Sequence, residues 1–264
     1  MDRILFATDL DGTILHHDRM NEEDLEAVRK LKELGATVAV ATGRPLNGVE
    51  TVFLNHGFEP DYLVLMNGSM VVDNSGNTIA EKTIDKDTAR IIADLCLECG
   101  FKVAFEGGRN TWFYRSDIPE GMSDTVPGVY AIDDISEMKD SIYLVSINGN
   151  ESIDEIEALR LEIESGFAGE VEAYRNVRYI DVVPKGISKG EGIRLIMALK
   201  GIGRQNVHVI GDSFNDIPMF REAGSSYTLS HAEDELKGYA DHVVDSVAEC
   251  IGKYILDEIA CANS

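Results

Sequence analysis

The chain has 264 residues, of which 44% are hydrophobic and 27% are charged, a composition typical of a soluble globular protein with one or two domains. Its 24 lysines and arginines are outnumbered by 47 aspartates and glutamates, which gives a formal charge of −23. A field of this sign disfavours nucleic acid and anionic membranes as partners. An anionic substrate would therefore need a local group of cations. The sequence does not indicate an oligomeric state.

Targeting and redox signals are weak in this sequence. The first residues do not have the pattern of a signal peptide, and no apolar run has the length of a membrane span. Cys96 and Cys99 fall late in a predicted helix, where neither a redox pair nor a zinc site is expected. We therefore predict a cytoplasmic protein without a disulfide framework.

The first third of the chain alternates between strand and helix patterns. We predict strands at 3–9, 37–41 and 62–66, helices at 22–34 and from Pro45 onward, and a hairpin that joins 71–72 to 78–80. Such alternation indicates right-handed βαβ units in a parallel sheet.

The pattern changes between residues 84 and 184. We predict helices at 85–99 and 152–165, strands at 101–105, 142–147, 170–174 and 178–183, a hairpin around 112–114, and an irregular stretch at 116–129. This mixture is typical of an α+β unit.

Strand–helix alternation resumes after Lys185. We predict helices at 189–200, 214–223 and 233–239, strands at 206–210, 226–229 and 242–244, and a closing helix. The fold class is therefore α/β. A Rossmann-like parallel-sheet core made of residues 1–83 and 185–264 would carry residues 84–184 as an inserted α+β domain.

Two carboxylates end the first predicted strand. Asp9 and Asp11 follow an apolar run and precede Gly12. Ligands of open α/β sheets bind at the carboxyl ends of the strands, and two acids so close need a cation or positive side chains to stay ionised. The pair indicates a divalent-metal site with one carboxylate free to attack and the other to move a proton. The alternative is a simple acidic turn.

Two further motifs follow predicted strands and offer groups for an anion. Thr42, Gly43 and Arg44 lie where a strand meets a helix, although Thr42 could simply cap that helix. Ser188 and Glu191 form a capping-box pattern around Lys189. A lysine at the first helical position opposes the helix dipole, and such a violation of local rules favours a functional role over a solvated side chain.

A fourth motif, Gly211-Asp212-Ser213-Phe214-Asn215-Asp216, follows the strand at 206–210. Asp212 and Asp216 are the hard oxygen ligands that Mg²⁺ prefers. Acidic capping of the next helix is the alternative.

Together these motifs resemble the haloacid dehalogenase superfamily, and within it the Cof-type sugar-phosphate phosphatases with a type-B cap. The resemblance covers essentially the whole chain, and it rests on DLDGT at 9–13, ATGR at 41–44, PKGISKG at 184–190 and GDSFNDIPM at 211–219. This chain departs from the family pattern at two places. Ser213-Phe214 replaces a small glycine pair, and Ser230-His231-Ala232 stands where an Asn-Ala pair is usual.

The resemblance implies a role for each matching position. Asp9 would attack phosphorus and Asp11 would transfer the proton. Phosphoryl oxygens would be held by Leu10, Thr42, Gly43, Lys189 and Asn215. Mg²⁺ would be bound by Asp9, Asp11 (through its carbonyl) and Asp212. Asp216 would orient Lys189 or a metal-bound water. Arg44, Asn67, Trp112 and Arg115 are candidates to contact the substrate.

The expected activity is Mg²⁺-dependent hydrolysis of small phosphomonoesters, such as sugar phosphates, through an aspartyl-phosphate. A phosphotransferase or mutase would use the same nucleophile and stays an alternative. A phosphoaspartate signalling module is disfavoured by Asp11 and by the inserted unit. The inserted residues would form a lid that reads the leaving group. The alternative for Trp112 is that it fills the core of that unit.

Overall fold

The computed structural model describes residues 4–149 and 152–256. Within them, strands form a larger sheet in the order β16 (His242–Val244), β15 (Ser225–Leu229), β14 (Val207–Gly211), β1 (Leu5–Thr8), β4 (Thr37–Ala41), β5 (Tyr62–Leu65), β6 (Met70–Asp73) and β7 (Thr78–Glu81). The pairs from β16 to β5 are parallel, and β6 and β7 are added antiparallel. The predicted parallel-sheet core is confirmed.

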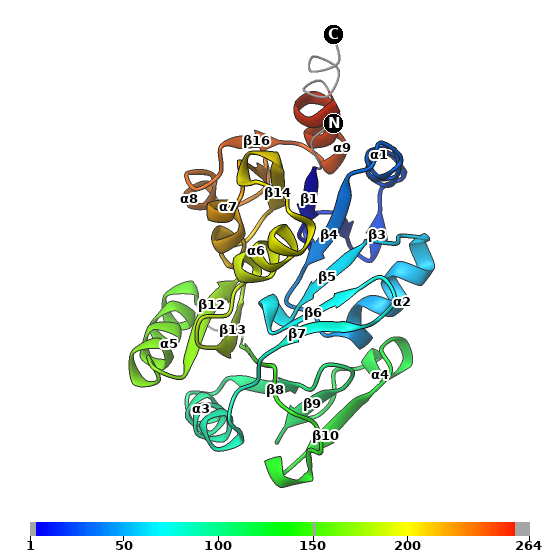
Figure 1. Cartoon of the computed structure of the whole chain (residues 1–264). Coiled ribbons are helices and arrows are strands. Elements are labelled where there is room, and N and C mark those ends of the chain that lie inside the picture. The colour runs from blue at the N-terminus through cyan, green and yellow to red at the C-terminus, as the bar shows by residue number, and fades with distance from the viewer. Residues whose placement is uncertain (1–3, 150–151, 257–264) are drawn as a thin grey trace.

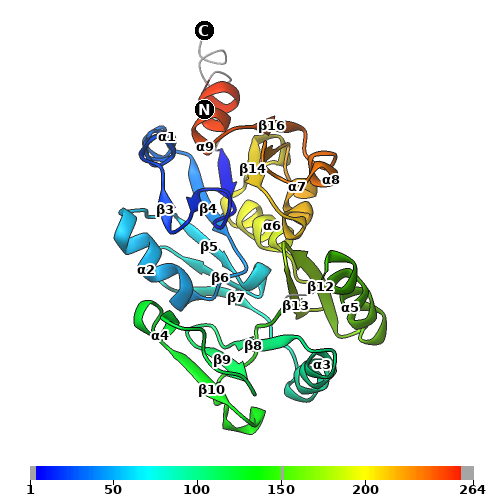
Figure 2. The same ribbon diagram turned by 180° about the vertical axis from the view of Figure 1, so that it is seen from behind.

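Helices cover both faces of this sheet, as Figures 1 and 2 show. One face packs on α1 (Glu22–Glu33), α2 (Leu46–His56), α9 (Val247–Cys250) and a π-helical turn (Ile251–Leu256), and the other on α6 (Lys189–Lys200), α7 (Ile217–Glu222) and α8 (Asp234–Lys237). The central strands alternate accordingly: Phe6 packs on the first face, and Leu5 and Ala7 pack on the second. Burial on both faces explains why these strands read as continuous apolar runs.

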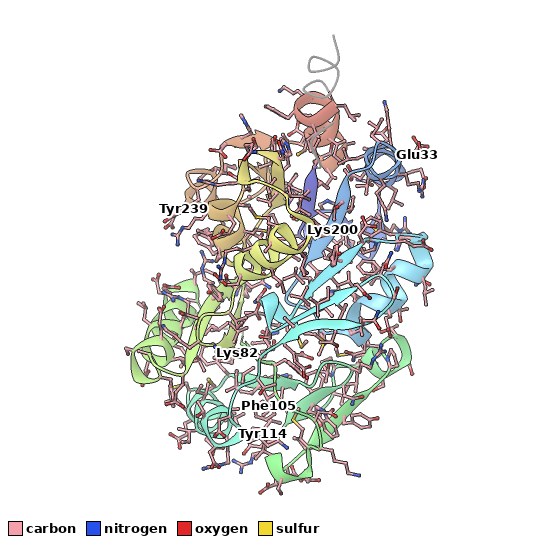
Figure 3. The ribbon with its side chains drawn as sticks, viewed as in Figure 1. Glu33, Lys82, Phe105, Tyr114, Lys200 and Tyr239 are labelled. Carbon is pink, nitrogen blue, oxygen red and sulfur yellow. The ribbon has the colours of Figure 1, made fainter. Side chains whose placement is uncertain are left out.

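A smaller sheet lies below the larger one in Figure 1. Its order is β10 (Val129–Ile132), β9 (Thr111–Tyr114), β8 (Lys102–Glu106), β11 (Leu144–Asn148), β13 (Tyr179–Pro184) and β12 (Val171–Asn176). The helices α3 (Lys86–Glu98) and α5 (Ile153–Gly166) pack on one of its faces. Phe105 and Tyr114 lie in this second core, with ring centroids 5.3 Å apart (Figure 3). The predicted inserted α+β unit is therefore present.

Alternation along the smaller sheet gives it two different faces. Ile180 and Val182 of β13 enter the second core, whereas Tyr179 and Asp181 line a cavity on the other side. Ser146 of β11 lines the same cavity between two buried core residues. Because side chains of a strand alternate between faces, the residues of this sheet that face the cavity are fixed by its register.

Some local predictions were wrong. The stretch 116–129 contains a short helix, α4 (Met122–Thr125), and it leads into β10, which pairs parallel with β9. The predicted helix 214–223 is a 3₁₀ turn (Phe214–Asp216) followed by α7. Ser213 and Asp216 form a capping box around that turn, and Pro218 lies in the first turn of α7. These two signals divide the predicted single helix into a 3₁₀ turn and a separate α-helix.

The remaining elements are short. They are the hairpin strands β2 (Leu15–His16) and β3 (Arg19–Met20), which the sequence did not predict, and 3₁₀ turns at Met66–Gly68, Ile135–Glu137 and Arg204–Asn206. In the described part of the chain, no helix is both long and apolar enough to cross a membrane.

Candidate active site

The acidic loop after β1 is held against the loop after β14. The Asp9 backbone N–H donates to the Ile210 carbonyl at 2.9 Å, which continues the pairing of the two strands. Gly12 has a φ of +79°, and a side chain there would overlap the Asp212 carboxylate. Glycine is thus required twice at position 12, for its backbone conformation and for the close approach of two acidic loops.

Three carboxylates meet at this point. Asp9, Asp212 and Asp216 each offer an oxygen, and these atoms lie within 4.8 Å of one another. The Thr13 hydroxyl donates to Asp212 Oδ1 at 3.2 Å, and His231 Nε2 lies 3.6 Å from Asp212 Oδ2. The unusual histidine of the Ser230-His231-Ala232 segment therefore lies beside one of the predicted metal ligands.

Burial raises the pKa values of these acids. The pKa of Asp9 is raised to about 7 by burial and by the charges of Asp216 and Asp11, against the opposing effect of Lys189. Burial and the Asp9 charge raise the pKa of Asp212 to about 6. Buried carboxylates with raised pKa values are stabilised in their ionised form by a nearby cation. The cluster is therefore suited to bind a divalent cation through oxygen ligands, as the sequence predicted for Mg²⁺.

Lys189 lies at the centre of this cluster. Its side chain is 1% exposed, and Nζ donates to Asp9 Oδ1 and to Asp216 Oδ1, both at 2.6 Å. Burial alone would lower the pKa of this lysine, but the Asp216 and Asp9 carboxylates raise it above its usual value. Lys189 is therefore a fixed cation, and its two ion pairs offset the unfavourable position at the start of α6.

The capping box predicted for α6 is only half formed. Ser188 Oγ accepts from the Glu191 N–H at 3.1 Å, whereas the Glu191 carboxylate pairs with Arg194. Gly68 packs directly against the same turn. A side chain at position 68 would overlap the Ser188 carbonyl oxygen.

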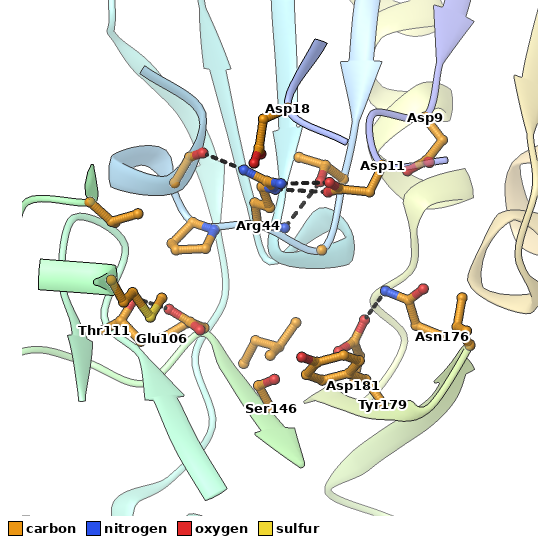
Figure 4. Close-up of a pocket in the computed structure, with 18 residues that line it drawn as sticks. Asp9, Asp11, Asp18, Arg44, Glu106, Thr111, Ser146, Asn176, Tyr179 and Asp181 are labelled. Carbon is orange, nitrogen blue, oxygen red and sulfur yellow. Dashed lines mark hydrogen bonds and ion pairs between the residues drawn. The ribbon is translucent and has the colours of Figure 1, made fainter. Parts of the chain in front are cut away.

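The loop after β4 supplies the next group of polar atoms. Thr42 is buried, and its Oγ accepts from the Arg44 N–H at 3.1 Å. Arg44 holds Asp11 in a bidentate pair, with Nε 2.8 Å from Oδ2 and Nη2 2.6 Å from Oδ1. Arg44 therefore fixes the exposed Asp11 carboxylate at the rim of the site (Figure 4).

A chain of amides joins this site to the smaller sheet. Asn215 Nδ2 donates to Asn67 Oδ1 at 3.2 Å, and Asn67 Nδ2 donates to Asp181 Oδ2 at 2.8 Å. Asn176 Nδ2 lies 3.3 Å from the same Asp181 oxygen. Among the described residues, the buried Asn215 Oδ1 has no hydrogen-bond partner. A buried polar atom without a partner indicates a place for a ligand group.

Asn176 and Asp181 border a cavity of about 640 Å³ between the two sheets, a size typical of small-molecule sites (Figure 4). The predicted residues that line it are Asp9, Asp11, Thr42, Gly43 and Arg44. Sequence reasoning missed the contributions of the smaller sheet, which include Glu106, Thr111, Ser146, Asn176, Tyr179 and Asp181. Each lies in an ordinary strand pattern, so no local signal distinguished it.

Trp112 and Arg115, two of the predicted candidates for substrate contact, do not line this cavity. The Trp112 ring stacks on Tyr130 at 4.6 Å, and its Nε1 donates to Asp140 Oδ2 at 2.9 Å. Arg115 Nη1 lies 3.0 Å from Asp94 Oδ1. The stacking partner Tyr130 belongs to β10, a strand that the sequence did not predict. This contact places the Trp112 ring within the smaller unit.

Comparison with known proteins agrees with the motifs. A profile described as haloacid dehalogenase-like hydrolase matches residues 6–255. The 5-amino-6-(5-phospho-D-ribitylamino)uracil phosphatase YcsE of Bacillus subtilis is 27% identical over 97% of this chain and 97% of its own. A phosphoglycolate phosphatase of Methanobrevibacter smithii is 24% identical over 95% and 97%. A solved haloacid dehalogenase-like hydrolase from B. subtilis superimposes with a TM-score of 0.85 at 21% identity, covering 95% of this chain and 99% of that one.

Proposed function

Since the chain belongs to the haloacid dehalogenase-like hydrolases, we propose that it hydrolyses small phosphomonoesters, such as sugar phosphates, with the help of Mg²⁺. The observation that carries the proposal is the buried cluster in which Lys189 Nζ lies 2.6 Å from Asp9 Oδ1. The cluster lies at the carboxyl ends of β1 and β14, and its member Asp9 lines a cavity large enough for a phosphorylated metabolite. The names of the two relatives support the reaction class, because both are phosphatases of small metabolites.

In this proposal Asp9 is the nucleophile. Its carboxylate attacks phosphorus and the bond to the leaving oxygen breaks. Asp11, which enters this step protonated and therefore released from its charged pairing with Arg44, donates a proton to that oxygen. Water then attacks the aspartyl-phosphate, Asp11 accepts its proton, and phosphate and the Asp9 carboxylate are released. Arg44 holds the Asp11 carboxylate at the cavity rim, where the leaving group would lie.

Lys189 and neutral donors would hold the phosphoryl group. Lys189 supplies a fixed positive charge, which counts most when charge develops on the equatorial oxygens. The Asn215 side chain, the Thr42 hydroxyl, and the Gly43 and Leu10 backbone N–H groups would complete the phosphate site.

The carboxylates of Asp9 and Asp212 and the carbonyl of Asp11 would hold Mg²⁺. The ion would supply charge neutralisation for the phosphoryl group and for the crowded carboxylates. Asp216 is engaged elsewhere, with Lys189 at 2.6 Å and with the Ser213 N–H at 3.0 Å. We therefore assign Asp216 to positioning Lys189.

We also propose that residues 84–184 act as a cap. Contacts between the two units support this: the Leu46 N–H donates to the Gly108 carbonyl at 2.8 Å, and Asn47 Nδ2 donates to the Pro127 carbonyl at 2.9 Å. A cap in this position would exclude bulk water from Asp9 and contact the leaving group.

Phosphate release from a panel of sugar, polyol and aryl phosphates tests the proposal. We expect hydrolysis with Mg²⁺, no hydrolysis with excess chelator, and inhibition by Ca²⁺, which takes more ligands at longer distances. Transfer of phosphate to a second metabolite without release into water would favour the mutase alternative. Full activity in chelator would contradict the metal assignment.

A further inference from the structure

The half of the cavity that faces away from Asp9 has an unusual charge pattern. In the described residues, the smaller sheet and its loops contribute the two carboxyl groups of Glu106 and Asp181 to the lining, and they contribute no lysine, arginine or histidine. Arg44, the cation of the lining, belongs to the other half and is paired with Asp11. A leaving group that enters this half therefore meets acceptors and negative charge without a compensating cation.

Glu106 ends β8 and is buried at the cavity wall (Figure 4). The hydroxyl of Thr111 donates to Glu106 Oε2 at 2.7 Å, and no hydrogen bond to its other oxygen is found among the described residues. Burial raises the pKa of Glu106 to about 7, against the effect of the Thr111 hydrogen bond. In either protonation state, this carboxyl group can accept a hydrogen bond from a ligand hydroxyl.

Asp181 approaches the cavity from β13, nearer to the phosphate end. Its Oδ2 accepts from the neutral amides of Asn67 and Asn176, and among the described residues no cation is hydrogen-bonded to it. Burial raises the pKa of Asp181, against the effect of those two amides and of the Lys189 charge. A side chain on Gly43 would come within 3.0 Å of Asp181 Oδ2, which shows how closely this carboxyl group borders the phosphate loop. The hydroxyl of Ser146 lines the same wall.

We propose, on the basis of the phosphatase function proposed above, that this half of the cavity selects leaving groups that carry hydroxyls and no negative charge. Hydroxyls would donate to Glu106, Asp181 and Ser146. A carboxylate or a second phosphate would instead meet a wall that offers no lysine, arginine or histidine to pair with it, beside acids that repel it when they are ionised. Neutral polyol phosphates are thus the substrate class, and phosphates of sugar acids and bisphosphates are rejected.

Sorbitol 6-phosphate and 6-phosphogluconate form a matched pair for the test, because both are linear and differ in a terminal hydroxymethyl or carboxylate group. We expect kcat/KM to favour sorbitol 6-phosphate by roughly 10–100-fold, the effect of a like-charge contact of about 1–3 kcal/mol. If turnover is too slow to measure, inhibition constants against an aryl phosphate give the same ratio.

Glu106→Gln and Asp181→Asn test the assignment to residues. Each substitution removes a charge and keeps the shape, so each should lower the preference for sorbitol 6-phosphate several-fold by improving kcat/KM for 6-phosphogluconate relative to it. Glu162→Gln is the matched control: Glu162 is exposed on α5 and away from the cavity, and its loss should leave the ratio at the wild-type value. Circular dichroism checks that each variant is folded.

Two failures can be told apart with p-nitrophenyl phosphate. If the wild type hydrolyses the aryl phosphate but treats the matched pair equally, the selection proposal is wrong and the phosphatase proposal stands. The same conclusion follows if neither charge removal changes the ratio in folded variants. If no phosphomonoester is hydrolysed, the proposed function itself fails, and the selection proposal falls with it.

Discussion

At the scale of single residues, the site is organised around a buried cation. Lys189 lies between Asp9 and Asp216 and forms an ion pair with each of them. Without this lysine, the two buried acids would face each other with no cation between them, so these three side chains act as a unit. The unit holds the proposed nucleophile in one orientation before any substrate arrives.

Asp9→Asn should reduce turnover by at least roughly 10⁴-fold, because the amide keeps the shape but is no nucleophile. The fold should persist, since Lys189 keeps its ion pair with Asp216. Phosphate release by the purified variant measures the effect, and Asp154→Asn on the exposed start of α5 is the control. Appreciable hydrolysis by a preparation free of other phosphatases would contradict the covalent role.

Lys189→Met should lower kcat by roughly 10²–10³-fold and change KM less, because its charge acts mainly on the transition state. Steady-state kinetics with one phosphomonoester separates the two parameters. Lys30→Met, an exposed lysine of α1, removes the same charge far from the site and should have no effect. A change in KM alone would reduce Lys189 to a binding residue.

At the scale of elements, the position of the smaller sheet depends on a contact outside the cavity. Arg175 of β12 forms a bidentate pair with Glu233, at 2.8 and 3.0 Å, and its guanidinium lies 4.1 Å from the centre of the Phe214 ring. The Val177 N–H also donates to Ser213 Oγ at 3.3 Å. Phe214 therefore contacts the smaller sheet and does not line the cavity of the candidate site.

Arg175→Gln should loosen the smaller sheet from the core, because it removes an ion pair with Glu233 and a cation–π contact with Phe214, both made by a guanidinium whose own side chain is only 9% exposed. Hydrogen exchange at the two connecting segments, 82–85 and 185–188, should become several-fold faster. Arg29→Gln, which breaks an exposed pair with Glu22 on α1, is the control. Unchanged exchange at both connections would show that other contacts fix the position of the smaller sheet.

At the scale of the whole molecule, stability depends on pH through a histidine buried in the larger sheet. His208 of β14 lies beside Tyr227, with Nδ1 3.2 Å from the hydroxyl, and burial lowers its pKa from 6.5 to about 4. The folded protein therefore favours the neutral ring, whereas the unfolded chain takes up a proton near pH 6.5. Stability from this group is complete above pH 6.5 and is lost as the pH falls towards 4.

The wild type should therefore lose about 2 kcal/mol more unfolding free energy than His208→Gln between pH 7.5 and pH 5. Urea unfolding at both pH values measures this difference, and groups common to both proteins cancel. Equal losses in the two proteins would show that His208 is protonated as easily in the folded state as in the unfolded chain.

The sequence by itself determined the core fold and the places of its motifs. Buried parallel strands read as apolar runs, and the residues just after them, such as Asp9, Thr42 and Asp212, lie at one edge of the sheet because parallel strands end there. These are local patterns with a fixed topological consequence, and the family profile over residues 6–255 agrees with them.

The tertiary structure decided what surrounds those motifs. The pairing of Lys189 with Asp9 joins residues 180 positions apart, and Asn67 reaches Asp181 across 114. Glu106 and Asp181 enter the cavity, whereas Trp112 turns to Tyr130, because register and strand neighbours select the face on which each side chain lies. Strand alternation in the sequence shows that two faces exist, but only the packed sheets determine which face meets the candidate active site.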